Sequence, residues 1–269
     1  MFDLSDKVVL VTGGAGLLGR MHSEAIVSNG GKVIIGDINL ESAERICEEI
    51  NELYSPVGPG FSYDPPLQKA FPIYLNVLDK NSIQNVLETY PDINVLINNA
   101  AIDPKVTDTT GPSGSFESLS MEEWDLSVDV MLKGTFLCSQ VFCPHFERNG
   151  GGVVINISSD LGVISPDQRI YDGSKKPITY SAAKHGIIGM TKYLATYYAQ
   201  SNIRVNSISP GGVYVNQPQD FVDRLTNLIP MGRMANKDEY KGSIVFLCSD
   251  ASSYMTGHNL IVDGGRTVW

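Results

Sequence analysis

Residues 7–19 read KVVLVTGGAGLLG, an apolar run that passes directly into a glycine-rich turn. The β-branched run predicts a buried strand, and the glycines followed by two leucines predict the start of a helix. Gly14, Gly16 and Gly19 match the spacing GxGxxG. In a strand–turn–helix unit such glycines let the backbone approach a pyrophosphate, which the helix N-terminus then binds. The stretch therefore predicts a dinucleotide-binding βαβ unit.

Short β-branched runs alternate with longer amphipathic stretches along the chain, which is typical of βαβ units around a parallel sheet. The expected strands are residues 7–11, 32–37, 71–76, 95–98, 152–158, 204–209 and 259–262. The expected helices are residues 18–29, 40–53, 80–90, 121–147, 180–200 and 237–249. Right-handed crossovers between seven strands predict one α/β domain over residues 1–269, with a doubly wound (Rossmann), mostly parallel sheet and helices on both faces.

Long loops follow three of the expected strands, at about residues 102–120, 165–179 and 212–230. In open α/β sheets the carboxyl ends of the strands form the ligand crevice. Long loops in compact domains are uncommon and are often functional. We therefore expect these three segments to form the substrate site. A fourth segment, residues 54–70, is rich in Pro, Gly and Tyr and is expected to be a loop.

Composition excludes several classes of function. The net charge of −10 argues against non-specific nucleic-acid binding, which needs a basic surface. Four cysteines without a CxxC pair are expected to be reduced thiols, and four scattered histidines form no metal motif. The N-terminal residues show no signal peptide, and we expect no membrane span. These features predict a cytoplasmic protein with no metal, nucleic-acid or membrane partner.

Tyr180 and Lys184 lie four residues apart within an expected helix, so both side chains can face one pocket. A phenol has a pKa of about 10, and a neighbouring cation lowers that value towards the range useful for proton transfer. A hydroxyl from Ser158 or Ser159 upstream could hold a substrate oxygen. With a nucleotide to carry the hydride, this set predicts alcohol–ketone interconversion. Taken alone, the pair would more often be an ordinary helix-surface pair.

Asp37 ends the second expected strand, eighteen residues after Gly19. A carboxylate at this position can accept hydrogen bonds from both adenosine ribose hydroxyls and would repel a 2′-phosphate. No Lys or Arg follows Asp37 immediately. The sequence therefore favours NAD(H) over NADP(H).

These residues together resemble the short-chain dehydrogenase/reductase family over essentially the whole chain. The matching segments are Asn76-Val77, Asn98-Asn99-Ala100-Ala101 (the NNAG motif with alanine for glycine), Ser159 with Gly162, Tyr180 with Lys184 (YxxxK), Pro210-Gly211 and residues 262–265. The resemblance implies that Tyr180 is the general acid or base, that Lys184 lowers its pKa and binds the nicotinamide ribose, and that Ser159 orients the substrate oxygen. It implies cofactor contacts from Gly13, Gly16, Leu17, Leu18, Gly19, Asp37, Ile38, Asn76, Val77, Asn99, Ala100, Ala101, Tyr180, Lys184, Pro210, Gly211, Gly212 and Val213.

The chain departs from the family pattern in four places. Met131 stands where asparagine is usual, which implies a slower or rerouted proton relay, or lost catalysis. The glycine turn has the Thr-Gly-x-x-Gly-x-x-Gly spacing that is more usual in the family's larger sugar-nucleotide branch. Val215 replaces a threonine whose hydrogen bond Asn216 could supply instead. Ser159 and Tyr180 are twenty-one residues apart, which is longer than usual.

The long insertion before Tyr180 is the best clue to the substrate. It carries Arg169, Lys175 and Lys176, natural partners for phosphate, and Tyr171, which could stack on a base or sugar. A solvated loop with ordinary surface charge explains it about as well. The loop is similar to a bacterial subgroup associated with flagellin modification, which implies phosphorylated or nucleotide-activated sugars leading to nonulosonic acids.

Three functions remain in competition. The leading hypothesis is an NAD-dependent sugar oxidoreductase of surface-glycan or flagellin modification. The alternatives are a carbonyl reductase for acyl or small ketone substrates, similar to 3-oxoacyl reductases, and a non-catalytic NAD-binding scaffold. Apolar residues on several faces of the expected helices 121–147 and 180–200 predict a homodimer or homotetramer, although complete burial of these helices would explain them equally well.

Overall fold

The computed structural model describes residues 1–54, 68–102 and 116–269. Its sheet has seven strands in the order β3-β2-β1-β4-β5-β6-β7, and all neighbouring strands pair in parallel. The strands are β1 (Val8–Thr12), β2 (Lys32–Asp37), β3 (Ala70–Tyr74), β4 (Val95–Asn98), β5 (Gly152–Ile157), β6 (Ile203–Pro210) and β7 (Asn259–Val262). The predicted doubly wound α/β fold is confirmed, and the sheet is parallel throughout.

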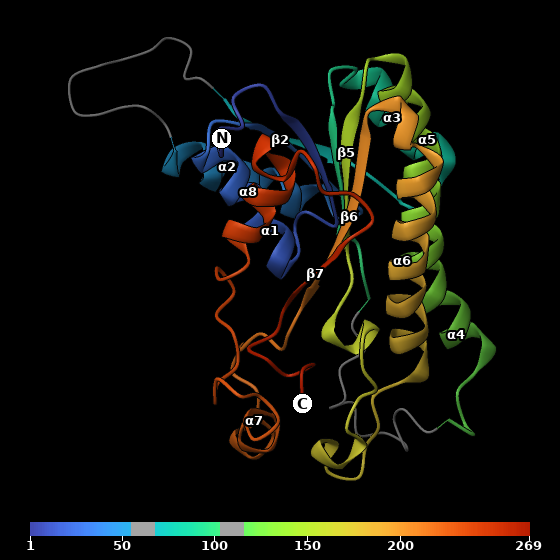
Figure 1. The fold of residues 1–269 in the computed structure, drawn as a ribbon, viewed down its shortest axis with the longest axis vertical. Helices are drawn as coiled ribbons and strands as arrows, with labels where there is room; N and C mark the ends of the chain where they lie inside the picture. Colours follow the sequence, from blue (N-terminus) through green and yellow to red (C-terminus); the bar gives the residue numbers. More distant parts are fainter. Residues whose placement is uncertain (55–67, 103–115) are drawn as a thin grey trace.

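Helices cover both faces of the sheet, as Figure 1 shows. One face is covered by α1 (Leu17–Ser28), α2 (Leu40–Leu53) and α8 (Lys241–Cys248). The other is covered by α3 (Lys80–Thr89), α5 (Gly134–Arg148) and α6 (Ile178–Tyr197), with α4 (Met121–Val128) beside α6. A short helix, α7 (Gln219–Thr226), lies near the C-terminus, away from both layers.

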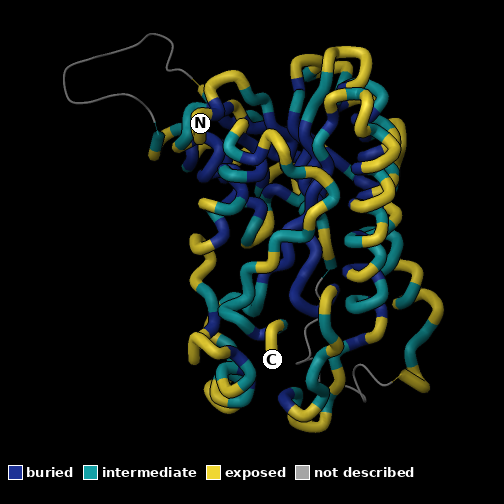
Figure 2. The backbone as a smooth tube through the Cα atoms, viewed as in Figure 1, coloured by how far each residue is buried: buried dark blue, intermediate teal, exposed yellow. Residues whose placement is uncertain are grey.

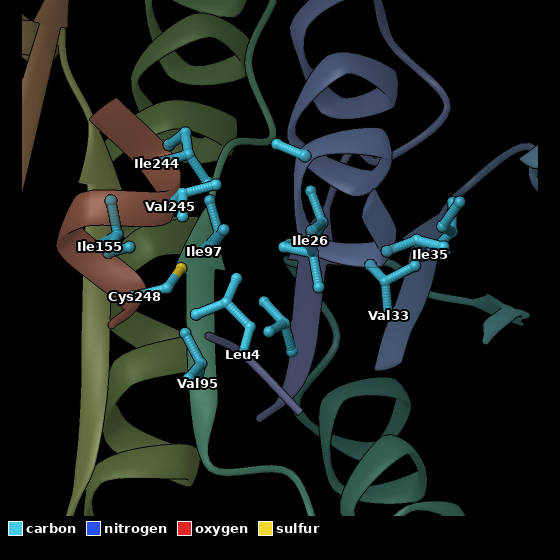
Figure 3. Packing of buried hydrophobic residues seen from close by; sticks show 14 of the residues in the cluster. Leu4, Ile26, Val33, Ile35, Val95, Ile97, Ile155, Ile244, Val245 and Cys248 are labelled. Carbon is cyan, nitrogen blue, oxygen red and sulfur yellow. The ribbon is translucent and has the colours of Figure 1, made fainter. Parts of the chain in front are cut away.

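Apolar side chains on the two faces of the sheet form two cores. The backbone is buried along the central strands and exposed on the outer sides of the helices (Figure 2). Ile97 on β4 and Ile155 on β5 meet Ile244 of α8 on one face (Figure 3). Because strands covered on both sides need apolar residues at successive positions, β4 reads Val-Leu-Ile with each residue fully buried.

Three predicted segments differ from the structure. The helix expected over residues 121–147 is interrupted by a π-helical turn, η1 (Asp129–Lys133), between α4 and α5. The segment expected as a loop over residues 212–230 contains α7, and the loop expected over residues 165–179 contains the 3₁₀ turn η3 (Gln168–Tyr171). Most of the expected loops 54–70 and 102–120 lies outside the described residues.

All four cysteines are buried free thiols, as predicted, and burial raises the pKa of each to about 12: Cys47, Cys138, Cys143 and Cys248. Within the described ranges, one helical stretch, Met121–Arg148, is long and apolar enough to cross a membrane by length and composition alone. In this fold 44% of its apolar window is buried, and core helices of soluble proteins pass the same test.

Candidate active site

The sequence-predicted site residues gather at the carboxyl ends of the strands. Gly13 follows β1, Asp37 ends β2, Asn99 follows β4, and Ser159 lies two residues after β5. β1 and β4 are neighbours in the sheet, and the strand order reverses between them. In open α/β sheets the ligand crevice forms at this switch point. The fold therefore brings the predicted cofactor and catalytic segments to one edge of the sheet.

The glycine turn leaves no room for side chains. Gly13 has φ 59°, and a Cβ added there would lie 2.8 Å from the Cα of Ala100. A Cβ at Gly19 would lie 2.4 Å from the carbonyl oxygen of Gly13 and 2.7 Å from the Cα of Gly14. Helix α1 begins after Gly16, which has no side chain to cap the first N–H groups. This cradle of open backbone fits the pyrophosphate of a dinucleotide.

Asp37 is fixed beside this turn by backbone donors. Its Oδ2 accepts from the N–H of Ala15 and its Oδ1 from the N–H of Asn39, each at 3.0 Å. The carboxylate thus points to the glycine turn from the end of β2, where an adenosine ribose would lie. Three further predicted cofactor residues around it are exposed or half-buried: Leu17, Leu18 and Ile38.

Thr12 joins the glycine turn to the segment after β4. Its Oγ1 accepts from the N–H groups of Asn99 and Ala100, each at 3.0 Å. The side-chain amide of Asn99 donates to the carbonyls of Thr12 at 3.0 Å and Gly13 at 2.9 Å. The Asn99 side chain therefore shapes the cradle, and exposed Ala101 follows at its rim. Sequence reasoning quoted Thr12 but assigned it no role.

Asn76 and Val77 lie after β3, next to the end of β2. The N–H of Leu75 donates to the carbonyl of Asp37 at 2.9 Å, which joins this segment to the carboxylate's own residue. The Asn76 Oδ1 accepts from the N–H of Leu78 at 3.0 Å, and Val77 is buried. The structure thus places both residues beside the end of β2 that carries Asp37, and their contact with a bound adenosine stays a prediction.

Lys184 and Tyr180 both lie on α6. Lys184 is 3% exposed, and its Nζ donates to the carbonyl of Ile157, the last residue of β5, at 2.8 Å. The same Nζ lies 5.7 Å from the ring centroid of Tyr180, which is half-buried. The predicted phenol–ammonium pair therefore forms, and the strand end holds the ammonium in place.

Close packing joins the segment after β5 to α6. Ser158 Oγ donates to the carbonyl of Lys184 at 2.8 Å. A Cβ added at Gly162 would lie 2.8 Å from the same oxygen. This contact gives the physical reason for a glycine three residues after Ser159, because any side chain would push the serine segment away from α6.

Ser159 is buried and its hydroxyl already has two partners. Its Oγ accepts from the N–H of Leu161 at 3.1 Å and lies 2.9 Å from Oδ1 of Asp160. Oδ2 of Asp160 accepts from Arg266 at 2.7 Å. Sequence reasoning missed both members of this ion pair; the adjacency of Asp160 to Ser159 was the signal for one of them.

Met131, at the position where asparagine is usual, lies in the π-helical turn η1 and is fully buried. Its carbonyl accepts from Thr135 Oγ1 at 2.7 Å. The thioether therefore fills core space between helices and offers only a weakly accepting sulfur.

The segment before Tyr180 packs against α7. Ile170 is buried with Leu225, and Arg224 Nε donates to the carbonyl of Ile170 at 2.9 Å. The ring of Tyr171 packs on Phe221 with centroids 5.7 Å apart. Tyr171 was expected to stack on a base or sugar; in this structure its ring contacts α7.

The segment after β6 carries the last predicted cofactor residues. Pro210 ends β6, and the N–H of Gly211 donates to the carbonyl of Val262 at 2.9 Å. Gly212 and Val213 follow, and Val213 forms an isolated parallel bridge with Ala235. Beyond them Val215 is exposed, and Asn216 is exposed in the left-handed region with φ 62°.

Comparison with known proteins agrees with this geometry. Residues 15–267 match the family described as enoyl-(acyl carrier protein) reductase. A 3-oxoacyl-[acyl-carrier-protein] reductase of Thermotoga maritima is 33% identical, over 98% of this chain and 99% of its own. A trans-4-hydroxycyclohexanecarboxylate dehydrogenase of Sinomonas cyclohexanicum is 33% identical, over 98% and 94%. A short-chain dehydrogenase of Leptospira borgpetersenii, solved with bound NAD+, superposes with a TM-score of 0.81 at 35% identity, over 99% and 94%.

The fold and the matched chains define an oxidoreductase that acts on alcohols or ketones with a nicotinamide cofactor. This chain belongs to the short-chain dehydrogenase/reductase family.

Proposed function

We propose that this protein is an NAD(H)-dependent oxidoreductase that interconverts a secondary alcohol and a ketone on a phosphorylated or nucleotide-activated sugar. The observation that supports the substrate class is the position of Lys176, whose ammonium lies over the ring of Tyr180. The cofactor choice depends on Asp37.

In this proposal Tyr180 Oη gives a proton to the ketone oxygen in reduction and takes it from the alcohol in oxidation. Lys184, 5.7 Å from the ring centroid and fixed by the Ile157 carbonyl, favours the phenolate through its charge. In the same proposal Ser159 would hydrogen-bond the substrate. A bound nicotinamide supplies or accepts the hydride.

NAD(H) is proposed as the cofactor because a carboxylate occupies the end of β2. Both oxygens of Asp37 are fixed by backbone N–H groups, so the negative charge cannot easily turn away from a 2′-phosphate. The bound NAD+ of the Leptospira relative is consistent with this choice.

Lys176 is the cation closest to the reacting phenol in the segment before α6. Its Nζ lies 4.2 Å from the Tyr180 ring centroid. The side chain of Gln168 fixes its backbone, accepting from the Lys176 N–H at 2.9 Å and donating to its carbonyl at 3.2 Å. This second ammonium beside the phenol supports a substrate with a phosphate or carboxylate near the reacting carbon.

The other two cations of this segment are more exposed to solvent than Lys176. Arg169 is 87% exposed at its side chain and pairs with Asp167 at 2.6 Å. Lys175 is exposed. Of the three predicted phosphate partners, Lys176 therefore carries the proposal, and the other two serve as controls.

The likeness of this segment to the flagellin-modification subgroup suggests a place in surface-glycan or flagellin modification, on a sugar leading to nonulosonic acids. We propose a cytoplasmic location for such an activity, because nucleotide-activated sugars and NAD(H) are both intracellular reagents.

A substrate panel tests the proposal. Purified protein is assayed with NAD+ and NADH on sugar phosphates, nucleotide sugars, cyclohexanol and ethyl acetoacetate. We expect Lys176→Met to raise the KM for the phosphorylated substrate about tenfold and to leave the KM for the neutral alcohol nearly unchanged. Only the anionic substrate loses a charged partner. Lys175→Met should leave both KM values unchanged. Turnover of neutral ketones alone would contradict the sugar assignment.

A carbonyl reductase for acyl substrates is the second candidate, and the Thermotoga relative favours it. Under this alternative the β-ketoester is reduced better than any sugar phosphate.

A non-catalytic NAD-binding scaffold is the third candidate. It is suggested by Met131, which is buried at the position where asparagine is usual. The variant Tyr180→Phe distinguishes the scaffold hypothesis from the two enzyme hypotheses. Turnover should fall by roughly 10²–10⁴ while NAD+ still binds; an unchanged biological effect would favour the scaffold.

We also propose a homodimer or homotetramer. Tyr193 and Tyr197 on α6 are 64% and 65% exposed and stack with centroids 5.9 Å apart, and Phe136 on α5 is 47% exposed. Large exposed apolar residues on two adjacent helices favour a second copy as the partner. Light scattering should give an even-numbered assembly that Tyr193→Glu dissociates, whereas Tyr254→Glu, at an exposed site outside α5 and α6, should not. A monomer in the unaltered protein would contradict this proposal.

A further inference from the structure

A buried tyrosine holds the first peptide after β6. The hydroxyl of Tyr240 donates to the carbonyl of Gly211 at 3.0 Å, and the Tyr240 side chain is fully buried in the core that α8 shares with the sheet. Tyr240 directly precedes α8, and Gly211 directly follows β6. Burial raises the pKa of the Tyr240 phenol above its ordinary value, so the hydroxyl keeps its proton and remains a hydrogen-bond donor.

This hydrogen bond is important because the peptide that it holds joins two glycines. A glycine adopts positive φ values about as readily as negative ones, so a Gly–Gly peptide can turn over at little cost. Neither Gly211 nor Gly212 has a positive φ in this structure. The carbonyl of Gly212 accepts from the N–H of Ala235 at 2.9 Å, which fixes the following peptide through the backbone. The orientation of the Gly211–Gly212 peptide depends instead on the Tyr240 side chain.

The direction of the carbonyl decides the direction of the N–H in the same peptide. In a planar trans peptide these two groups point in opposite directions. The Gly211 carbonyl points into the core towards Tyr240, so the N–H of Gly212 points away from that core, at a half-buried position. Within the part of the chain that the structure describes, no group accepts from this N–H. The segment after β6 therefore offers one oriented donor.

The strand order indicates which half of a dinucleotide lies near this donor. In the proposed complex Asp37 at the end of β2 holds the adenosine, and the glycine turn after β1 holds the pyrophosphate. The other half of the cofactor then extends in the opposite direction, over the ends of β4, β5 and β6. Lys184 is bound to the end of β5, and Gly211 follows the neighbouring strand. The donor thus lies on the nicotinamide side of the crevice.

We propose that Tyr240 is a positioning residue for the nicotinamide half of the cofactor. Its hydroxyl keeps the Gly211–Gly212 peptide turned so that the N–H of Gly212, and not the carbonyl of Gly211, is presented to the bound cofactor. This inference rests on the proposed cofactor NAD(H). It involves no substrate, so it is independent of the sugar assignment.

The test compares NAD+ with ADP-ribose, which has the same adenosine and pyrophosphate but no nicotinamide. Tyr240→Phe keeps the buried ring and removes the hydroxyl. The loss of one oriented donor should raise the dissociation constant of NAD+ about 3- to 10-fold and leave that of ADP-ribose unchanged. Titration calorimetry measures both constants, and Tm checks folding. Tyr90→Phe, at a half-buried tyrosine of the other core, should change neither constant.

A purely structural role predicts a different result: Tyr240→Phe would weaken NAD+ and ADP-ribose by the same factor. That outcome would overturn the inference. A second variant separates the orientation of the peptide from packing. Gly212→Ala is added to Tyr240→Phe, because alanine disfavours the positive φ that a turned-over peptide needs at this position. The added Cβ would lie 3.1 Å from Leu225 Cδ2 and 3.3 Å from Met234 Cε, both at the ends of flexible side chains.

The double variant should recover at least half of the NAD+ affinity that Tyr240→Phe loses; no recovery contradicts the proposed role of peptide orientation. A crystal structure of the unaltered protein with NAD+ gives a readout that needs no variant. We expect Tyr240 Oη to stay within hydrogen-bond distance of the Gly211 carbonyl, and a peptide turned over towards the nicotinamide overturns the inference.

The cofactor assignment and this inference can fail separately. Tighter binding of NADP+ than of NAD+ by the unaltered protein rejects the choice of NAD(H) alone. The same comparison is then made with NADP+ and 2′-phospho-ADP-ribose, and equal effects of Tyr240→Phe on these two ligands reject the role of Tyr240.

Discussion

The Nζ of Lys184 lies 5.7 Å from the ring centroid of Tyr180 and donates to the carbonyl of Ile157 at 2.8 Å. The same ammonium therefore hydrogen-bonds to the end of β5 and lies near the phenol ring. Because β5 also leads into Ser159, one strand end positions the lysine and the serine together. A strand inside the sheet therefore positions both groups.

Lys184→Met should lower kcat by roughly 10²–10⁴, the usual contribution of positioned acid–base groups. Without the cation the phenol releases its proton less readily, so the pH profile of alcohol oxidation should move to higher pH. The change is measured from initial rates between pH 6 and about 10, with Tm as a check on folding. Lys192→Gln, an exposed lysine of the same helix, should behave as the unaltered protein. A Lys184→Met profile without a shift would count against the assigned role.

Gly19→Ala should weaken cofactor binding at least tenfold and lower Tm. The added Cβ would meet the Gly13 carbonyl at 2.4 Å and the Gly14 Cα at 2.7 Å, and neither can move without opening the turn. Calorimetric titration with NAD+ and thermal unfolding report the two effects. Gly242→Ala is the matched control, because nothing lies within 4 Å of its added Cβ in α8; it should be neutral or stabilise by up to about 1 kcal/mol.

Asp37→Asn should reduce the affinity for NAD+ about tenfold and increase that for NADP+. The variant removes the charge that accepts from ribose hydroxyls and repels a 2′-phosphate. Glu41→Gln removes one charge from the exposed first turn of α2 and should leave both affinities unchanged. The dissociation constants of both variants for NAD+ and NADP+ measure these changes. Equal losses in the two variants would show that net charge matters more than the placed carboxylate.

The sequence was sufficient for the strands and for the motifs that follow them. β2, α2, β4 and β7 have the predicted bounds, because apolar runs with clear ends fix elements that the sheet buries. The YxxxK pair was predictable since its geometry depends only on helical spacing.

Features that depend on contacts between distant segments could not be predicted. α7 is short and follows Pro218, and Leu225 is buried against Ile170, far away in the sequence. The ion pair of Asp160 and Arg266 produces no periodic pattern in the sequence, because it is a single contact between two distant residues. Their contact forms only in the folded protein, between the segments that follow β5 and β7 on either side of β6.

Glu24→Gln should destabilise the protein by about 1–2 kcal/mol at pH 7, because Glu24 accepts from Lys241 at 2.6 Å and Arg20 at 3.0 Å and both cations are partly solvated. Burial raises the pKa of the Glu24 carboxyl, but the hydrogen bonds and positive charges of Lys241 and Arg20 together outweigh it and hold the pKa below its ordinary value. A carboxyl with a lowered folded pKa stabilises above its unfolded pKa and loses that contribution as pH falls through the folded value.

The destabilisation caused by Glu24→Gln should therefore shrink below about pH 4.3, where the carboxyl of the unfolded chain becomes protonated, and vanish at lower pH, where the folded carboxyl does too. Urea unfolding at pH 7 and near pH 3.5 measures both differences. Glu88→Gln, at an exposed glutamate of α3, should change stability little at either pH. A Glu24→Gln effect of equal size at the two pH values would mean that shape and packing, and not the charge held between α1 and α8, account for the contribution of this residue.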